Sequence, residues 1–368
     1  MAEASRPRVA IVLTASTGGI GRHVASVAPR LVERGFDVTV HAPEVTLAAH
    51  DLGVPTVPLR LDGSLGPLGP VGPATALLGV AGGADLVHAH GYKAAALALP
   101  AARLRRVPLL VSWHNAVLGS GAAARAGRLL QRLSARAGLV LAASDDLRAQ
   151  AVALGAREAV LAPVAAPALA APRTPPAVRR AALGLGDGAV LVVTVTRLAP
   201  QKNLDLLLDV AARTRGRAGL AYALVGGGPL HDALARRVAD EALPVTLVGP
   251  SDDVASWLGA ADLALLPSRW EARALVAQEA LLAGVPLVAT RVGGVPELVG
   301  DAAVLVDPDD PDGAARAVLA LADDAGARRR LADAGRARAA TWPDEDDVAD
   351  ETAARYRHVL AGPRRPAS

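Results

Sequence analysis

Short apolar segments alternate with longer amphipathic segments along almost the whole chain. The apolar segments are rich in Val, Leu and Ala, as buried strands are, and the segments between them have the period of helices. This alternation predicts an α/β architecture of two doubly wound domains, each a parallel sheet between layers of helices. The expected strands cover residues 9–14, 38–41, 86–89, 109–112 and 139–142 in the first half and 190–194, 222–225, 245–248, 263–266, 287–290 and 304–306 in the second.

A proline-rich segment separates the two runs of alternating elements. Residues 162–180 contain five prolines and show no periodicity, which is typical of a linker. The 368 residues are therefore expected to form Rossmann-like domains over 1–165 and 178–342, followed by a helix over 343–362 for which packing back on the first domain is one option. Because ligands of such sheets bind beyond the carboxyl ends of the strands, the chemistry is expected on strand-to-helix loops, in a cleft between the domains.

Composition narrows the classes of partner. Aromatic residues make up only 2% of the chain, too few for base-stacking platforms, so nucleic acid is not expected as a partner. The net charge of +3 suits anionic small molecules or an acidic membrane surface. The chain has no cysteine and no apolar segment of the ~20 residues that span a bilayer, which favours a cytoplasmic location and leaves peripheral contact with the inner membrane face open. A basic helix face, which we interpret as solvated rather than lipid-binding, is formed by Arg125, Arg128, Arg132 and Arg136.

A glycine-rich turn follows the first expected strand. Gly18 and Gly19 precede a helix, where free backbone amides and the positive helix end suit a phosphate. The nicotinamide-binding fingerprint is incomplete, because Val24 stands where it needs Gly or Ala and the second strand ends at His41 without a ribose-binding acid. These differences argue against a dehydrogenase.

Two cations and two acids mark the second half. Arg197 closes its first strand and Lys202 begins the next helix, so the two can neutralise a diphosphate, although two surface cations at a turn are the alternative. Glu271 lies on the loop after a later strand, and Glu279 lies in the helix that follows. Each carboxylate can accept two hydrogen bonds from the vicinal hydroxyls of a ribose or hexose, and free amides over residues 272–275 can meet oxygens between them.

Taken together and in this order, these segments resemble the retaining glycosyltransferases of family four, which have the GT-B fold. The resemblance extends over nearly the whole chain. The matching segments are the turn at 18–19, His-Ala-His-Gly at 88–91, Ser-Trp-His-Asn at 112–115, Ala-Ser-Asp at 143–145, Arg197 with Lys202, Val-Gly-Gly-Gly-Pro-Leu at 225–230, Glu271 with Glu279, and Gly-Gly-Val-Pro-Glu at 293–297.

The resemblance implies that the second domain holds most of a nucleoside diphosphate sugar, UDP- or GDP-linked. The first domain would hold most of the acceptor, which is a glycan such as that of a cell envelope, a lipid or a small molecule. The implied catalytic residues are Arg197 and Lys202 at the diphosphate, Glu271 at the donor sugar and His114 beside the transferred sugar. It also implies Glu279 at the ribose. From the residues themselves we expect the donor to be bound in addition by Gly18, Gly19, Arg273, Ala274 and Leu275, and the acceptor to be contacted by His90.

The chain departs from the family where its pattern usually reads Glu-Gly-Phe-Gly. Ala272, Arg273 and Ala274 follow Glu271 here. Alanine in place of glycine removes positive-φ freedom and narrows the room for a sugar. Arg273 is expected to point into the cleft and add a cation beside the donor phosphates.

No metal or cofactor is expected. Asp307 and Asp309 form an Asp-x-Asp of the kind that binds divalent cations, but we interpret them as a solvated turn in which Asp312 caps the next helix. His88 and His90 share one strand face but have no third ligand nearby in sequence, so a metal site is rejected. A retaining, metal-independent transferase is thus the leading hypothesis, with a sugar-nucleotide epimerase and a non-catalytic nucleotide-sugar-binding protein as alternatives.

Overall fold

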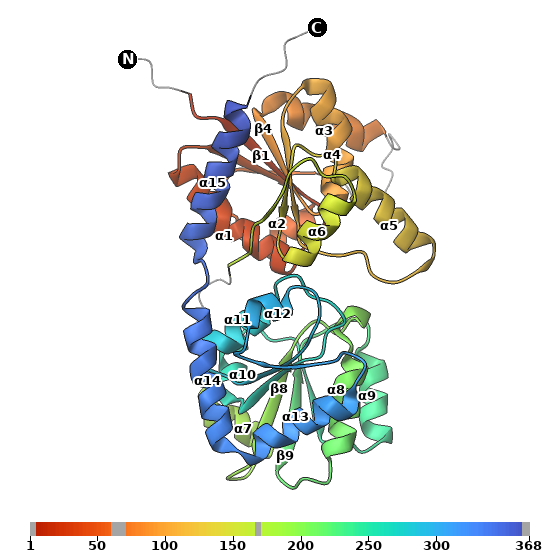
Figure 1. Cartoon of the computed structure of the whole chain (residues 1–368), viewed down its shortest axis with the longest axis vertical. Coiled ribbons are helices and arrows are strands. Elements are labelled where there is room, and N and C mark those ends of the chain that lie inside the picture. Colours follow the sequence, from red (N-terminus) through yellow and green to blue (C-terminus); the bar gives the residue numbers. More distant parts are fainter. Residues whose placement is uncertain (1–4, 60–70, 166–170, 363–368) are drawn as a thin grey trace. The chain divides into compact units, whose positions relative to one another are not determined.

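The computed structural model describes residues 5–59, 71–165 and 171–362, and the chain divides into two compact units (Figure 1). Unit 1 contains residues 1–167 and 343–368, and unit 2 contains residues 168–342. The segment predicted to be a linker spans this boundary, and residues 166–170 within it lie outside the described residues. The prediction of a linker as far as residue 180 is wrong, because helix α7 (Pro176–Ala182) begins inside that segment.

Unit 1 is built on a sheet of seven parallel strands in the order β3-β2-β1-β4-β5-β6-β7. The five strands expected from the sequence are present. The two that sequence patterns missed, β3 and β7, are three-residue strands at the sheet edges whose side chains are exposed or half-buried. The strands are β1 (Arg8–Leu13), β2 (Asp37–Ala42), β3 (Thr56–Pro58), β4 (Leu86–His90), β5 (Leu109–Trp113), β6 (Leu139–Ala142) and β7 (Ala159–Leu161).

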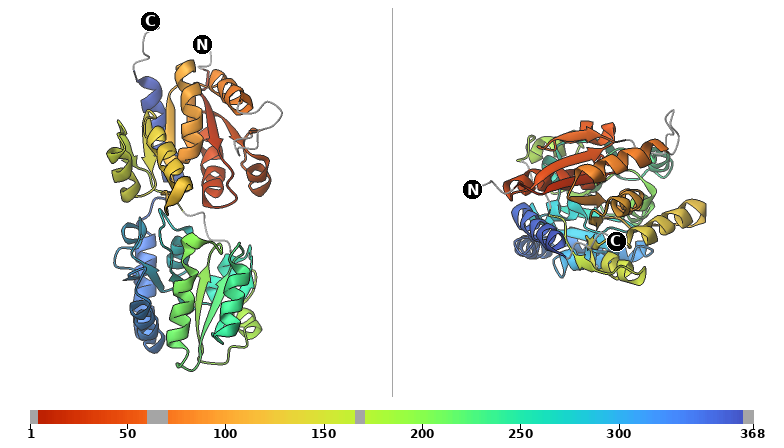
Figure 2. Two further views of the ribbon diagram at one scale, coloured as in Figure 1. Left: turned by 90° about the vertical axis from the view of Figure 1, so that its right-hand side faces the viewer. Right: turned by 90° about the horizontal axis from the view of Figure 1, so that it is seen from above.

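Helices cover both faces of this sheet (Figure 2). They are α1 (Gly19–Glu33), α2 (Glu44–Ala49), α3 (Val71–Gly83), α4 (Tyr92–Arg105), α5 (Gly121–Ser134), α6 (Asp145–Ala153) and, from the far end of the chain, α15 (Glu345–Ala361). Helix α15 lies along α1, where Arg30 Nη2 is 2.6 Å from Glu345 Oε2 and Arg34 Nε is 2.6 Å from Asp350 Oδ1. Tyr356 of α15 is fully buried in the core of unit 1.

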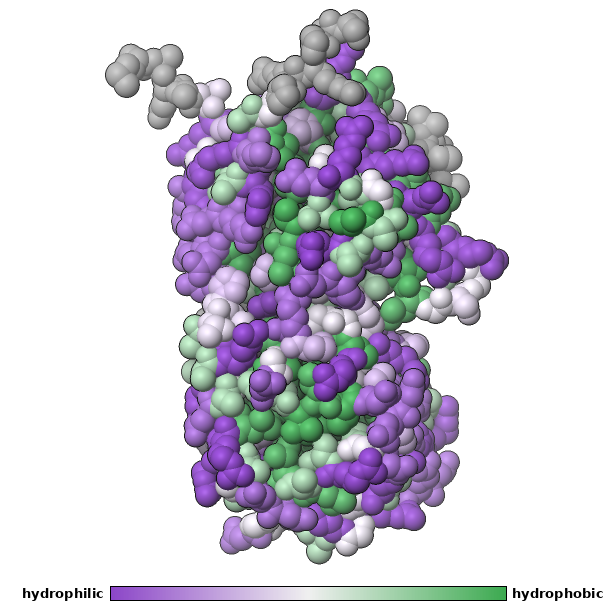
Figure 3. Space-filling model, viewed as in Figure 1, coloured by the Kyte–Doolittle hydropathy of each residue, from purple (hydrophilic) through white to green (hydrophobic). Residues whose placement is uncertain are grey.

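Helix α5 carries the basic face noted in the sequence. Its three arginines, Arg125, Arg128 and Arg132, are exposed, as is Arg136 just beyond its end, and the opposite side buries Ala124, Gly127, Gln131 and Ser134. In Figure 3 the end of α5 at the right of unit 1 is hydrophilic. No helix among the described residues is long and apolar enough to cross a membrane.

Unit 2 is built on a sheet of six parallel strands in the order β10-β9-β8-β11-β12-β13, and all six were expected from the sequence. The strands are β8 (Val190–Val195), β9 (Leu220–Val225), β10 (Val245–Gly249), β11 (Leu263–Leu266), β12 (Leu287–Thr290) and β13 (Val304–Val306). Besides α7, the helices are the 3₁₀ turn η1 (Pro200–Lys202), α8 (Leu204–Thr214), α9 (His231–Asp240), α10 (Val254–Ala260), α11 (Leu275–Leu282), α12 (Val295–Val299), α13 (Pro311–Asp323) and α14 (Ala325–Ala339).

Both sheets have a point where the strand order reverses. In unit 1 strand β1 lies between β2 and β4, and in unit 2 strand β8 lies between β9 and β11. Open parallel sheets bind ligands outside the carboxyl ends of the strands at this switch point. The prediction of two doubly wound, Rossmann-like sheets is confirmed. The loops that follow β1, β4, β8 and β11 lie at the two switch points.

The start of α13 differs from the prediction. The predicted cap, Asp312, is wrong: Asp310 caps the helix by accepting a hydrogen bond of 2.8 Å from the backbone amide of Gly313. Pro311 then occupies the first helical position, which its missing N–H suits. Asp312 pairs instead with Arg213, whose Nε lies 2.5 Å from Asp312 Oδ1.

Candidate functional site

The loops after β8 and β11 meet through a charge pair. Lys202 ends the turn η1, and Glu271 lies between β11 and α11. Lys202 Nζ lies 2.5 Å from Glu271 Oε1, and Ser268 Oγ lies 2.7 Å from the same oxygen. Only 11% of the Glu271 side chain is exposed and 20% of that of Lys202. A carboxylate withdrawn from water in this way requires its cation and its hydroxyl donor.

Further hydrogen bonds fix the two loops against each other. Gln201 Nε2 donates to the carbonyl of Trp270 at 2.9 Å, and the amide of Arg269 donates to the carbonyl of Gln201 at 2.9 Å. Thr290, buried at the end of β12, donates through its hydroxyl to the carbonyl of Ser268 at 2.6 Å. The carboxylate and ammonium groups are therefore held by the backbone on both sides.

Two glycine segments hold these loops at close range. The first follows β9, where Gly226 and Gly228 have φ of +146° and +154°. A Cβ on Gly228 would lie 2.5 Å from the carbonyl oxygen of Leu198, and one on Gly226 would collide with the carbonyl of Thr196. Only glycine allows this backbone approach, which positions Arg197 between the two contacted residues.

The second glycine segment precedes α12. Gly293 has φ of +50°, and a Cβ there would collide with the carbonyl oxygen of Glu271. The amide of Gly294 donates to that same carbonyl at 2.9 Å. The Gly-Gly-Val-Pro-Glu segment thus packs against the backbone of Glu271 and forms a hydrogen bond with it.

The other residues of unit 2 that are predicted to bind the donor lie near Lys202 or Glu271 in the sequence. Arg197 is exposed, and within the described part of the chain it has no ion-pair partner. Ala274 is the N-cap of α11 and Leu275 its first residue, so their amides lie at the helix N-terminus. Glu279 lies one helical turn further on and is buried, with 6% of the residue exposed.

Arg273 lies beside an aromatic ring. Its guanidinium carbon is 5.9 Å from the ring centre of Trp342, and the charges of Glu297 and Arg338 act on it. Burial lowers the pKa of Arg273 to about 10, an effect that Glu297 opposes and Arg338 reinforces. Arg273 thus packs beside Trp342 within unit 2. Its expected place beside the donor phosphates stays a prediction.

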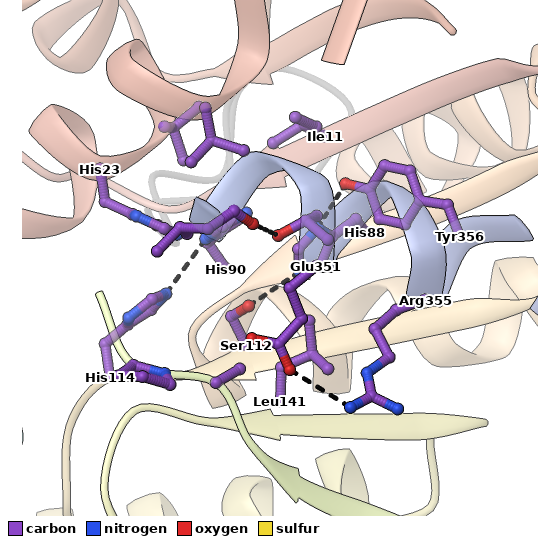
Figure 4. A pocket seen from close by; sticks show the side chains of 16 residues that line it. Ile11, His23, His88, His90, Ser112, His114, Leu141, Glu351, Arg355 and Tyr356 are labelled. Carbon is purple, nitrogen blue, oxygen red and sulfur yellow. Dashed lines mark hydrogen bonds and ion pairs between the residues drawn. The ribbon is translucent and has the colours of Figure 1, made fainter. Parts of the chain in front are cut away.

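In unit 1, histidines gather at the ends of β4 and β5. His90 Nδ1 lies 3.1 Å from Nε2 of His114, and the two rings are stacked with centres 5.3 Å apart. His23, on α1, lies 5.5 Å from the His90 ring and 5.4 Å from the His114 ring, measured between centres. Figure 4 shows these three side chains turned toward one another. Gly18 and Gly19 are exposed at the start of α1, with the amide end of the helix accessible.

His88 lies next to this histidine cluster and is fixed by two hydrogen bonds. His88 Nδ1 lies 2.6 Å from the hydroxyl of Tyr356, and His88 Nε2 lies 2.8 Å from the hydroxyl of Ser112. The His88 and His90 rings are 4.2 Å apart. Helix α15 therefore reaches the histidine cluster through Tyr356 (Figure 4).

Burial governs the protonation of these groups. It lowers the pKa of His23 to about 4 and, with His23 nearby, that of His88 to about 3. The pKa values of His90 and His114 also lie well below the usual range, first because of burial and then because of the neighbouring histidines. All four imidazoles are neutral at pH 7 and able to donate and accept hydrogen bonds.

Sequence reasoning did not identify His23, Ser112 or Tyr356 as part of this cluster. The only signal for His23 was its position one helical turn after Gly19, on the helix that the glycine turn starts. Tyr356 comes from the far end of the chain, and no local pattern connects it with His88.

Comparison with known families identifies the two halves. A family model described as "Glycosyl transferases group 1" matches residues 189–324, and one described as "Glycosyl transferase 4-like domain" matches residues 18–167. The chain is 31% identical to D-inositol 3-phosphate glycosyltransferase 2 of Catenulispora acidiphila, with 95% of each chain covered. The chain belongs to the group 1 glycosyltransferases. The family-four resemblance seen in the sequence is confirmed.

Other relatives of this glycosyltransferase differ in their named products. It is 30% identical to a glycogen synthase of Mycobacterium tuberculosis, with 77% of this chain and 70% of that one covered. Among solved structures, it resembles Anabaena Alr3699/HepE in complex with UDP-glucose, with a TM-score of 0.83, 21% identity, and 96% of this chain and 100% of that one covered. Sucrose-phosphate synthase (tll1590) from Thermosynechococcus elongatus gives a TM-score of 0.77 at 22% identity, covering 97% and 100%. These structures share the GT-B fold.

The close approach at Gly228 leads to a testable expectation. Gly228→Ala forces a methyl group against the Leu198 carbonyl and should destabilise unit 2 by at least about 1 kcal/mol. Gly186→Ala is the matched control, because a Cβ at Gly186 meets nothing within 4 Å and its φ is not positive. Urea unfolding of both full-length variants measures the difference. Equal stability would show that the Gly228 loop yields without cost and does not fix Arg197.

Proposed function

We propose that this glycosyltransferase moves a sugar from a nucleoside diphosphate sugar to an acceptor hydroxyl with retention of the anomeric configuration. The observation that carries the proposal is the pair of Lys202 and Glu271 at the switch point of unit 2. It provides an ammonium group and a carboxylate on loops fixed by two glycine segments. A charged leaving group and a polyhydroxylated sugar require these two kinds of group.

The diphosphate is the group on which charge develops as the donor bond breaks. Fixed positive groups that are in place before the reaction give large rate effects in such steps, on the order of 10²–10³-fold per donor. Lys202 is one such group, held at the end of η1, and Arg197 is an exposed arginine on the preceding turn. The amides at the start of α11, from Ala274 and Leu275, add the positive end of a helix.

The carboxylates are assigned to the hydroxyl groups of the donor. Glu271 keeps its second oxygen for the donor sugar while Oε1 is held by Lys202 and Ser268. Glu279, on α11, is assigned to the ribose. In this proposal Glu271 orients the sugar, and a donor phosphate oxygen takes the proton of the attacking acceptor hydroxyl.

Unit 1 is assigned to the acceptor side of the reaction. His114 is half-buried with a lowered pKa, and it contributes a hydrogen bond to the transferred sugar without carrying charge. His90, in contact with His114, is assigned to the acceptor. The exposed amides at Gly18 and Gly19 are assigned to the donor phosphates.

The donor nucleotide is proposed to be UDP or GDP. Support for UDP comes from Anabaena HepE, whose structures are with UDP and with UDP-glucose. The acceptor is proposed as a glycan, lipid or small molecule, and the relatives named for D-inositol 3-phosphate and for glycogen fall within that range. We also propose that the enzyme works in the cytoplasm, in peripheral contact with the membrane where its acceptor is a lipid, and without metal or cofactor.

Donor recognition is tested first by ligand binding. Thermal shifts across UDP, GDP, ADP and their sugars should single out one nucleotide, because binding stabilises the folded chain in proportion to ln(1 + [L]/Kd). Incubation with that donor alone should give at most slow hydrolysis. Conversion of the donor into an epimer would contradict transfer, and binding without any product in glycan or lipid extracts would indicate a non-catalytic binder.

The role of Arg197 is tested by one substitution. Arg197→Ala removes a charge-assisted hydrogen bond of about 1.5–3 kcal/mol, so the Kd for the preferred nucleoside diphosphate should rise about 10- to 100-fold. Unfolding should change little, because the side chain is exposed. Arg215→Ala, an exposed arginine after the far end of α8, is the control. Equal dissociation constants for both variants by calorimetry would remove Arg197 from the donor site.

The metal dependence of transfer gives a separate expectation. Transfer should persist in EDTA, because Lys202 and Arg197 supply the positive charge that a divalent ion would otherwise bring to the diphosphate. Loss of transfer on chelation and its return with Mg²⁺ would overturn this expectation and direct attention to Asp307 and Asp309, which are on the loop before α13.

A further inference from the structure

The histidine cluster of unit 1 is more than a hydrogen-bonded pair. His23 comes from α1, His90 ends β4 and His114 follows β5, so three separate segments converge. One ring nitrogen of each residue lies within 4.8 Å of the corresponding nitrogens of the other two. A metal site was rejected from the sequence because only two histidines, His88 and His90, lie close together there. The missing third histidine is supplied by α1, 65 positions before His88 in the chain.

The spacing of the nitrogens fits a small tetrahedral cation. Zn²⁺ binds imidazole nitrogen at 2.0–2.1 Å, which places two ligating nitrogens roughly 3.3 Å apart. The Nδ1 of His90 and the Nε2 of His114 are already 3.1 Å apart. A ring nitrogen of His23 lies within 4.8 Å of both, so His23 would have to move closer to them to act as the third ligand.

The chemistry of the ligands selects the class of metal. Three imidazoles without a carboxylate suit Zn²⁺ and related transition metals, whereas Mg²⁺ and Ca²⁺ prefer oxygen ligands. A metal needs the lone pairs of Nδ1 of His90 and Nε2 of His114, so the proton in the hydrogen bond between them must move to the other nitrogen of its ring when the metal binds. The cavity that these rings line has a volume of about 20 Å³, enough for an ion or a single water and too small for a sugar.

His88 is close to the three histidines but is not available as a fourth metal ligand. Both of its ring nitrogens are engaged, one with the hydroxyl of Tyr356 and the other with that of Ser112. Its ring packs on that of His90 at 4.2 Å and limits the orientations open to His90. His88 is thus a support for the site, and the fourth position of a bound metal stays open to water or a ligand.

We propose that His23, His90 and His114 bind one Zn²⁺-class cation, and that the bound cation inhibits transfer by occupying the ring nitrogen of His114. The inhibition rests on the proposed function of His114 at the transferred sugar, whereas the metal binding does not. In this proposal the bound cation inhibits the enzyme and is not a cofactor, as the expectation that transfer persists in EDTA requires.

Metal binding is tested on the metal-free, full-length protein. Titration with Co²⁺ should produce the visible absorption of a tetrahedral complex at one equivalent, and Zn²⁺ should displace it with a measurable Kd. His23→Gln removes a ligand outside the proposed catalytic residues. Since loss of a partner in the outer shell costs up to about 100-fold in affinity, loss of this ligand should weaken Zn²⁺ binding by at least that factor.

The control is His231→Gln, a half-exposed histidine of unit 2, which should leave the Kd for Zn²⁺ unchanged. Far-UV circular dichroism verifies folding, and His90→Gln replaces His23→Gln should the latter unfold. No saturable Co²⁺ or Zn²⁺ site in the wild-type protein, or equal affinities in the His23→Gln and wild-type proteins, would overturn the metal site.

Inhibition is tested once a donor and an acceptor give measurable transfer. Saturating Zn²⁺ should reduce transfer by the wild-type protein at least about tenfold, and EDTA should restore it, whereas His23→Gln should need much more Zn²⁺ for the same effect. Full transfer at saturating Zn²⁺ would overturn the inhibition. Absence of any transfer would contradict the proposed function and leave the Co²⁺ and Zn²⁺ titrations to decide the metal site on their own.

Discussion

The contact between Lys202 and Glu271 is the constraint on which the candidate site of unit 2 depends. The Glu271 carboxylate is almost withdrawn from water, so its loop is stable only where an ammonium group and the Ser268 hydroxyl meet it. This requirement fixes the turn after β8 against the loop after β11, and it explains the neighbouring features. Gly293 and Gly294 permit close contact with the Glu271 carbonyl, and Gly228 lets the next loop support the β8 turn.

The switch point of unit 1 holds a cluster of histidines, whereas that of unit 2 holds the charge pair of Lys202 and Glu271. There the side chains are neutral imidazoles stacked at the ends of β4 and β5, and burial keeps them uncharged. Helix α15 supports them through the hydrogen bond of Tyr356 with His88. The two switch points thus offer different chemistry: a fixed charge pair in unit 2, and uncharged hydrogen-bonding imidazoles in unit 1.

The fold could be predicted where burial dominates. Strands such as β4 and β11 are buried along their full length and appear in the sequence as apolar segments. The edge strands β3 and β7 were missed because exposure removes that signal. The cap of α13 was misplaced by two residues, from Asp310 to Asp312, because several acids in one loop give local patterns that do not fix the register.

The sequence could name Lys202 and Glu271 as candidates but could not predict that they pair. The family motifs identified Lys202 and Glu271, but their contact joins loops 69 positions apart. The contact of Arg273 with Trp342 was not predicted, because sequence position gives no side-chain rotamer. His23 was missed for a related reason, since only the packing of α1 brings it to His90 and His114.

A double-mutant cycle on Lys202 and Glu271 tests the central claim most directly. The affinity for the preferred nucleotide sugar is measured by calorimetry for the wild type, Lys202→Met, Glu271→Gln and the double variant, with folding checked by thermal unfolding. If the pair binds the donor as one unit, each single change weakens binding and the double change adds little, a coupling of at least about 1 kcal/mol. Unchanged affinity in both single variants, or strictly additive losses, would contradict the account.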